Sequence, residues 1–170
     1  MSYLVVCPLL DLARVVTAHS ASHVLTVISD DMPVPTPSSV SLENHLTLHF
    51  NDIAVASPGL SLAKTTDIDK MIGFAKSWDQ VRPMVIHCWM GVSRSTASAA
   101  TVLATLQPDR PAQEIFAEIR FNAPFASPNH RIVTLADATL HRGGEMIAAL
   151  ENLATAQECF QGMPFKLDLD

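Results

Sequence analysis

The residues best suited to carry chemistry lie together in the segment His87 to Ser95, which reads His-Cys-Trp-Met-Gly-Val-Ser-Arg-Ser. It holds one cysteine, Cys88, and five residues separate this cysteine from Arg94. A cysteine thiolate is a strong nucleophile, and the arginine guanidinium is a planar fork that can meet two oxygens of a phosphoryl group at once. The spacing therefore predicts nucleophilic attack by Cys88 on a phosphate group held beside it.

The sequence on either side of this segment predicts a strand and a helix that would hold it in place. Met84 to His87 is short and apolar, as expected of a central strand that is buried on both faces. Ser95 to Leu106 is rich in alanine and apolar all round, which indicates a buried helix. Cys88 would then stand at the carboxyl end of the strand, followed by a loop that enters the helix.

The loop between this strand and helix is expected to bind phosphate through its backbone. Successive N–H groups can turn inward toward the anion, with the positive end of the helix dipole behind them. The loop residues concerned are Trp89, Met90, Gly91, Val92, Ser93 and Arg94. Gly91 allows dihedral angles that other residues rarely adopt. The same dipoles, together with Arg94, favour the thiolate form of Cys88, so this nucleophile needs no adjacent base.

The segment His87 to Ser95 resembles the H-C-x5-R signature of the protein tyrosine phosphatases. Its portion Gly91 to Ser95, Gly-x-Ser-Arg-Ser, is most similar to the dual-specificity branch, and the size of the chain resembles the small bacterial members. Six matching residues at fixed spacing have a chance probability of about 10⁻⁶ over such a chain. The order of the predicted strands and helices around the segment is also similar to the family's fold.

The resemblance implies a mechanism in which Cys88 forms a cysteinyl-phosphate that water then hydrolyses. In the family, an aspartate on a loop before the cysteine protonates the leaving oxygen, and Asp52 is the candidate here, at 88 − 52 = 36 positions upstream. Ser95 is implied to donate a hydrogen bond to the thiolate as it leaves. Two further candidates are His87, expected to hydrogen-bond near the loop, and Asn129, which either orients the water or caps a helix.

Apolar and β-branched runs predict four strands, and apolar residues at helical spacing predict helices between and after them. The predicted strands are Leu4 to Cys7, His23 to Ile28, His45 to Phe50 and Met84 to His87. The predicted helices are one opening at Pro8, Thr66 to Trp78, Ser95 to Leu106, Ala112 to Phe121, Pro128 to Leu140, and Glu145 to about Gln157. This order predicts an α/β fold with a central, mostly parallel sheet of four or five strands flanked by helices, similar to the phosphotyrosine protein phosphatases. Residues 1–170 are expected to form a single phosphatase catalytic domain.

Several polar side chains are expected to have structural roles. Thr66 and Asp69 look like a capping pair for the helix that ends near Trp78, and Ser127 is expected to cap the helix that follows it. Asp137, in that later helix, is expected to pair with a nearby arginine or amide.

The composition limits the class of partner. A hydrophobic content of 48% with 16% charged residues excludes a largely disordered chain, and a net charge of −6 argues against binding to nucleic acid or to a membrane surface. The start of the chain lacks a signal-peptide pattern, so a cytoplasmic location is expected. No cofactor or metal is expected, because the three cysteines form no C-x-x-C pair. His45 and His49 would lie about 13 Å apart on the solvent face of one strand, too far for one ion.

The expected partner is a phosphorylated protein or a small phosphate monoester, with the oligomeric state left open. Phosphotyrosine, phosphoserine and phosphothreonine are all compatible with the signature, whereas the uncharged Trp89, Met90 and Val92 disfavour polyanionic substrates. Two other interpretations are a phosphate-binding module without turnover, and sulfurtransferase or arsenate reductase-like chemistry. Asp52 has no evident purpose in a binding module or a sulfurtransferase. Arsenate reductases need resolving thiols, whereas Cys7 is expected in the core.

Overall fold

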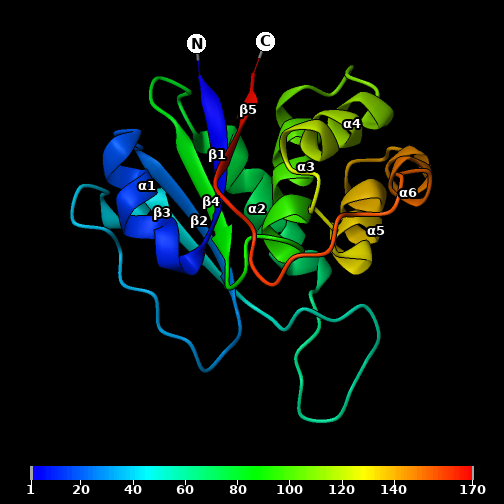
Figure 1. Cartoon of the computed structure of the whole chain (residues 1–170), viewed down its shortest axis with the longest axis horizontal. Helices are drawn as coiled ribbons and strands as arrows, with labels where there is room; N and C mark the ends of the chain where they lie inside the picture. Colours follow the sequence, from blue (N-terminus) through cyan, green and yellow to red (C-terminus); the bar gives the residue numbers. More distant parts are fainter. Residues whose placement is uncertain (1, 170) are drawn as a thin grey trace.

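The computed structural model describes residues 2–169, and Figure 1 shows one sheet with helices on both sides. The described strands are β1 (Tyr3–Pro8), β2 (His23–Ile28), β3 (His45–His49), β4 (Met84–Cys88) and β5 (Phe165–Asp168). The described α-helices are α1 (Leu12–Ala18), α2 (Thr65–Ser77), α3 (Arg94–Leu106), α4 (Ala112–Asn122), α5 (His130–Thr139) and α6 (Glu145–Glu151). Two short 3-10 helices, η1 (Leu9–Asp11) and η2 (Leu42–Asn44), precede α1 and β3.

The strands pair in the order β3-β2-β4-β1-β5. Strand β2 runs parallel to β3 and β4, and β1 runs parallel to β4, whereas β5 is antiparallel to β1. The central strand β4 is buried along its whole length, as its apolar sequence predicts. The predicted α/β fold with a mostly parallel sheet is therefore confirmed. The carboxyl ends of β1 to β4 meet at the same edge of the sheet.

The last strand, β5, is not predicted from the sequence. It has four residues, of which Phe165 and Leu167 are buried, whereas Lys166 and Asp168 are exposed. So short an alternation is too weak a signal to distinguish a strand from a loop. Because β5 pairs with β1, the first and last strands of the chain lie side by side (Figure 1).

Strand β1 shows why both faces of the sheet need cover. Leu4 and Val6 belong to a large core that α2 to α6 complete, whereas Val5 and Cys7 belong to a smaller core beneath α1. Figure 1 shows α1 on one face of the sheet and α2 to α6 on the other. The expected core position of Cys7 is confirmed. Within residues 2–169, no helix is both long and apolar enough to pass through a lipid bilayer.

The predicted cap of α2, a pair formed by Thr66 and Asp69, is wrong. The carboxylate of Asp67 instead reaches back and accepts a hydrogen bond from the backbone N–H of Lys64 at 2.8 Å. The first turn of a helix leaves its N–H groups without helical partners, and a carboxylate at the third helical position is placed to accept from the residue before the helix.

The predicted cap of α5, Ser127, is also wrong. Asn129 caps this helix, because its side-chain oxygen accepts a hydrogen bond from the backbone N–H of Ile132 at 3.1 Å. Ser127 lies outside the helix, since its own backbone N–H donates to the carbonyl of Val92 at 3.0 Å. That bond ties the start of α5 to the loop that follows Cys88.

Asp137 joins α5 to α6 through its carboxylate. Its two oxygens accept hydrogen bonds from the backbone N–H groups of Gly144 at 2.7 Å and Met146 at 2.9 Å, and the side chain is buried. The expectation that Asp137 has an amide partner is confirmed. The contact supplies acceptors for N–H groups that the start of α6 leaves unpaired.

We expect Asp137→Ala to lower the free energy of unfolding by about 1–3 kcal/mol, because two backbone donors lose their acceptor. Chemical denaturation of both proteins measures the difference. Asp69→Ala, at an exposed position of α2, serves as the control and should change stability by less than about 0.5 kcal/mol. Equal effects of the two substitutions would contradict this role of Asp137.

Candidate active site

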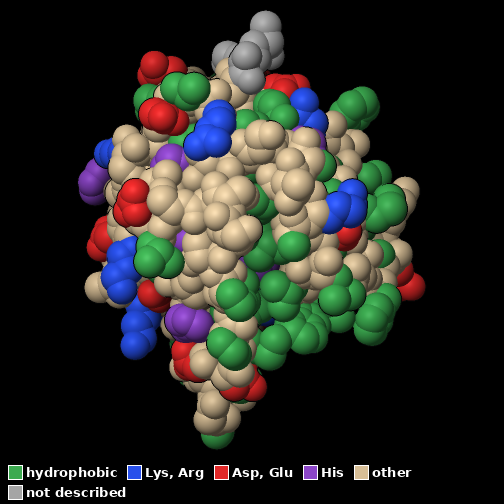
Figure 2. Space-filling model, turned by 90° about the vertical axis from the view of Figure 1, so that its left-hand side faces the viewer, with side chains coloured by type: hydrophobic (Ala, Val, Ile, Leu, Met, Phe, Trp, Pro, Cys, Tyr) green, Lys and Arg blue, Asp and Glu red, His purple; other side chains and the backbone are tan. Residues whose placement is uncertain are grey.

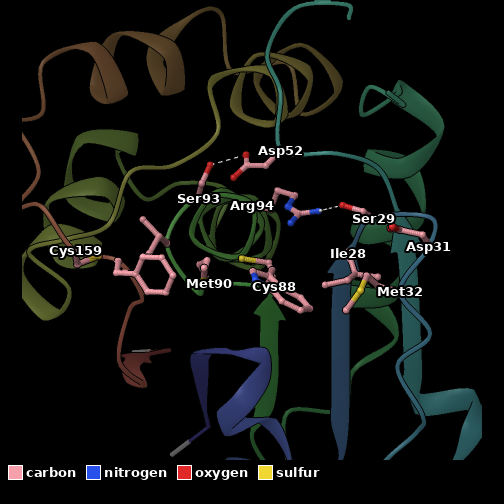
Figure 3. Close-up of a pocket in the computed structure, with 13 residues that line it drawn as sticks. Ile28, Ser29, Asp31, Met32, Asp52, Cys88, Met90, Ser93, Arg94 and Cys159 are labelled. Atoms are coloured by element: carbon pink, nitrogen blue, oxygen red, sulfur yellow. Dashed lines mark hydrogen bonds between the residues drawn. The ribbon is translucent and has the colours of Figure 1, made fainter. Parts of the chain in front are cut away.

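Strand β4 ends at Cys88, whose side chain lines a cavity of about 470 Å³ at the carboxyl edge of the sheet (Figure 3). Cys88 is only 2% exposed, and its Sγ is hydrogen-bonded to Oγ of Ser95 at 3.2 Å. Ser95 comes from the first turn of α3 and is fully buried. The structure thus brings together the predicted nucleophile and the hydroxyl predicted to stabilise it.

Gly91 determines the shape of the loop between β4 and α3. Its φ angle is +70°, in the left-handed region that favours glycine. A Cβ at this position would lie 2.6 Å from the backbone nitrogen of Pro8 and 2.9 Å from the carbonyl carbon of Cys7. The loop therefore packs directly on the end of β1, with no room for a side chain between them.

Arg94 opens α3 and is buried beside the cavity. Its Nη1 donates a hydrogen bond to Oγ of Ser29 at 3.3 Å (Figure 3) and another to the backbone carbonyl of Phe50 at 2.8 Å. Its Nε is also buried but has no hydrogen-bond partner within residues 2–169. An unpaired buried guanidinium N–H is costly. Arg94 therefore offers a fixed donor to an anion that enters the cavity.

Asp52 lies on the loop after β3, and two side chains hold it at the cavity. Its Oδ1 accepts a hydrogen bond from Oγ of Ser93 at 2.8 Å (Figure 3) and another from Nδ2 of Asn129, also at 2.8 Å. The Asp52 side chain is exposed. Because both donors use the same carboxylate oxygen, Oδ2 is left for another partner. The predicted acid and nucleophile thus line one cavity, although 36 positions separate them in the sequence.

Asn129 uses both ends of its amide group. The oxygen caps α5, and the nitrogen donates to Asp52 and, at 3.4 Å, to the carbonyl of Ile53. The capping interpretation of this residue is therefore confirmed. Asn129 does not itself line the cavity. Its role in orienting a water molecule stays a prediction.

His87 lies next to Cys88 in β4 but contributes to packing between strands. Its Nε2 is hydrogen-bonded to Oγ1 of Thr26 in β2 at 2.7 Å, and the side chain is fully buried. Burial is the largest cause that lowers the pKa of His87, to about 4, so the ring is neutral at pH 7. The expected hydrogen bond exists, and it is made to the neighbouring strand.

The prediction that His45 faces solvent is wrong. Its Nδ1 is hydrogen-bonded to Oγ1 of Thr36 at 2.7 Å and its Nε2 to Oγ1 of Thr26 at 2.7 Å, because the loop after β2 folds back over this side chain. Burial lowers the pKa of His45. His49 is exposed as predicted. Among residues 2–169, no group of three or more His, Cys, Asp or Glu side chains is placed to hold a metal ion.

Some residues of the cavity are not predicted from the sequence. One wall comes from the end of β2 and the residues after it, namely Ile28, Ser29, Asp31 and Met32. A signal for this wall exists in the sequence. Parallel strands have their carboxyl ends at the same edge of the sheet, and Ser29 directly follows β2, so it could have been placed near Cys88. The opposite wall includes Cys159 (Figure 3) and its neighbour Phe160, for which the sequence holds no local signal.

The segment after α6 carries this second wall. The helix predicted to reach Gln157 ends at Glu151, and the backbone N–H of Gln157 donates to the carbonyl of Pro124 at 3.0 Å. Farther along, the N–H of Gly162 donates to the carbonyl of Met90 at 2.9 Å. The segment leaves the helix because these contacts draw it across the loop that follows Cys88.

Comparison with known proteins finds similarity in structure but not in sequence. No protein-family model and no curated protein matches the chain by sequence. The PTP-2 phosphatase of Cydia pomonella matches with a TM-score of 0.62 at 16% identity, over 95% of this chain and 92% of that one. Human DUSP28 matches with a TM-score of 0.62 at 13% identity, over 82% and 92%. PTPMT1 in complex with PI(5)P matches with a TM-score of 0.58 at 16% identity, over 81% and 87%.

The chain has the fold of the protein tyrosine phosphatase superfamily. Its structural neighbours include several dual-specificity phosphatases, so the resemblance stated from the segment His87 to Ser95 is confirmed at the level of the fold.

We expect Gly91→Ala to lower the free energy of unfolding by at least about 1–2 kcal/mol, because a Cβ would meet the backbone of β1 and the residue would keep a positive φ. Chemical denaturation measures the change. The matched control is Gly73→Ala in α2, where nothing lies within 4 Å of the added Cβ. Because alanine is the better helix former, Gly73→Ala should gain up to about 1 kcal/mol. A neutral Gly91→Ala would overturn this account of the loop.

Proposed function

We propose that this protein is a cysteine-dependent phosphatase that hydrolyses phosphate monoesters. The observation that carries the proposal is the pairing in one cavity of the buried Cys88 thiol with the Arg94 guanidinium, whose Nε has no partner within residues 2–169. Phe50 and Ser29 fix this guanidinium before any phosphate arrives, which is the preorganisation that stabilises a charged transition state. The fold shared with dual-specificity and tyrosine phosphatases also supports the proposal.

In the first step, the Cys88 thiolate attacks phosphorus in line with the bond to the leaving oxygen. The S–P bond forms, and the P–O bond to the leaving group breaks. The loop N–H groups and Arg94 bind the other phosphoryl oxygens, while Asp52 gives a proton to the leaving oxygen. Since Ser93 and Asn129 both hold Oδ1, we assign this proton to Oδ2 of Asp52.

In the second step, water attacks the cysteinyl-phosphate. Asp52, now a carboxylate, accepts a proton from that water, the S–P bond breaks and inorganic phosphate leaves. The hydroxyl of Ser95, 3.2 Å from Sγ, donates a hydrogen bond to the thiolate of Cys88 as it departs. Both steps use only groups of the protein, the ester and water.

The proposed substrate is a phosphorylated protein or a small phosphate monoester. Among the described residues that line the cavity, Arg94 is the one Lys or Arg side chain, and Asp31 and Asp52 add negative charge. Multiply phosphorylated ligands need more positive charge than this cavity supplies. We propose that one catalytic domain spans residues 1–170, because β1 and β5 belong to the same sheet as the site.

Cys88→Ser tests the proposal directly. The unchanged protein should hydrolyse p-nitrophenyl phosphate, and Cys88→Ser should lose the activity, because serine is not ionised at neutral pH. Asp69→Ala, at an exposed position of α2 that does not line the cavity, is the control and should keep the activity. Continued turnover by Cys88→Ser would refute the proposal.

The mass of the intact protein separates the alternatives. Rapid quenching during turnover of a phosphate ester should reveal a phosphoryl adduct that Cys88→Ser lacks. An adduct formed with thiosulfate or arsenate, and none with the ester, would instead indicate sulfur transfer or arsenate reduction. Binding of phosphate without any adduct would indicate a silent binding module.

Asp52→Ala should lower kcat by roughly 10² to 10⁴, with a smaller loss for p-nitrophenyl phosphate than for phenyl phosphate, because a good leaving group needs less protonation. Asn129→Ala should show the same dependence on the leaving group with a smaller loss, since it removes one of the two donors that hold Asp52. Asn122→Ala, at an exposed position in α4, is the control for Asn129. Equal losses on both esters would contradict the role of Asp52 as the acid.

A further inference from the structure

A second, smaller hollow opens beside the proposed catalytic cavity. It measures about 220 Å³ and is lined by Leu9, Leu10, Trp89, Met90, Phe160 and Gln161. Three of these residues, Trp89, Met90 and Phe160, also line the catalytic cavity, so the two hollows share a wall. We call this second hollow the apolar groove. It is smaller than the roughly 300–1,000 Å³ of pockets that enclose a drug-sized ligand, and its size suits one side chain.

The apolar groove is surrounded by large hydrophobic side chains that the fold leaves in solvent. Leu10 is 84% exposed, Phe160 is 87% exposed and Trp89 is 45% exposed. Seen from the side of α1 and β3, hydrophobic side chains gather low on the molecule, on the lower right of Figure 2, with no Lys or Arg among them. Exposed apolar residues grouped around one groove are typical of a binding surface, whereas single ones are ordinary.

Backbone hydrogen bonds fix the floor of the groove on both sides. The N–H of Leu9 donates to the carbonyl of Trp89 at 3.2 Å, which joins η1 to the loop after Cys88. On the other side, the N–H of Gly162 donates to the carbonyl of Met90 at 2.9 Å. The groove is therefore formed before any ligand binds, and a bound apolar group need not order it.

Charge decides between the possible occupants of the groove. Arg94 is the one cation among the described residues that line the two hollows, and it lies inside the catalytic cavity. Asp31 stands on the wall opposite Cys159 (Figure 3), and the chain carries a net charge of −6. These charges repel a lipid surface that carries many negative charges. A phosphopeptide instead brings a phosphate group that Arg94 can bind, and the apolar side chain beside it adds no further negative charge.

We propose that the apolar groove is a substrate subsite that takes an apolar side chain next to the phosphorylated residue of a phosphopeptide. The inference rests on the proposed phosphatase function and adds the class of substrate. An extended peptide advances about 3.3 Å per residue, so a residue close to the phosphorylated one reaches a groove that shares a wall with the cavity. Burial of a leucine-sized side chain there would favour peptides that carry one.

The test measures kcat/KM on matched phosphopeptides. In each set of phosphotyrosine, phosphoserine or phosphothreonine peptides, one leucine replaces a serine at successive positions on either side of the phosphorylated residue. At the position that reaches the groove, leucine should raise kcat/KM about tenfold over serine. Leu10→Ser should abolish most of the preference for leucine over serine. Leu42→Ser is the control, because Leu42 is 78% exposed and lines neither hollow, and it should keep the preference.

Three results would overturn the subsite. One is an absence of any leucine preference in a protein that does hydrolyse p-nitrophenyl phosphate. Another is a change in sedimentation mass on Leu10→Ser, which would assign the groove to a second copy of the chain. The third is faster turnover of a phospholipid monoester in neutral vesicles, with the same dependence on Leu10. If p-nitrophenyl phosphate itself is not hydrolysed, the phosphatase proposal fails, which is a separate result.

Discussion

The close packing of Gly91 on the backbone of Pro8 is the constraint on which the site depends. Pro8 stands opposite Cys88 in the β1–β4 ladder, so the loop turns over the end of the neighbouring strand as soon as β4 stops. No side chain fits between the loop and β1. Because this packing fixes the position of the loop, it also fixes Cys88 at the start of the loop and Arg94 at its end. The rigid sheet thus sets the geometry of the loop to which we assign the chemistry.

The ends of the other parallel strands complete this arrangement. The carbonyl of Phe50, which directly follows β3, holds the guanidinium of Arg94, and Asp52 comes two positions later. Ser93 and Asn129 then hold Asp52 from the loop and from α5. Each group that the proposed mechanism uses is therefore bonded to another group of the site, and a shift in one strand would move several of them together.

The end of the chain contributes to both the sheet and the surface around the site. The segment after α6 crosses the loop, where Gly162 bonds to Met90, and then enters β5 at the edge of the sheet. A cation–π contact also joins β5 to β1, because the ammonium of Lys166 in β5 lies 3.9 Å from the centre of the Tyr3 ring in β1. The same segment presents Phe160 to the cavity and to the apolar groove, so the proposed substrate preference depends on residues far from Cys88 in the sequence.

The sequence by itself determined what is local. The segment His87 to Ser95 holds the proposed nucleophile, the proposed anion-binding loop and Arg94 in one stretch. The apolar runs predict the four parallel strands and most helices, because short-range spacing reflects which faces are buried. Only the tertiary structure decided the rest: the strand β5, the wall around Phe160, the half-buried place of His45, and the bond from Asn129 to Asp52. These depend on contacts between distant segments, and an exposed aromatic or a four-residue edge strand has no periodicity that a sequence can reveal.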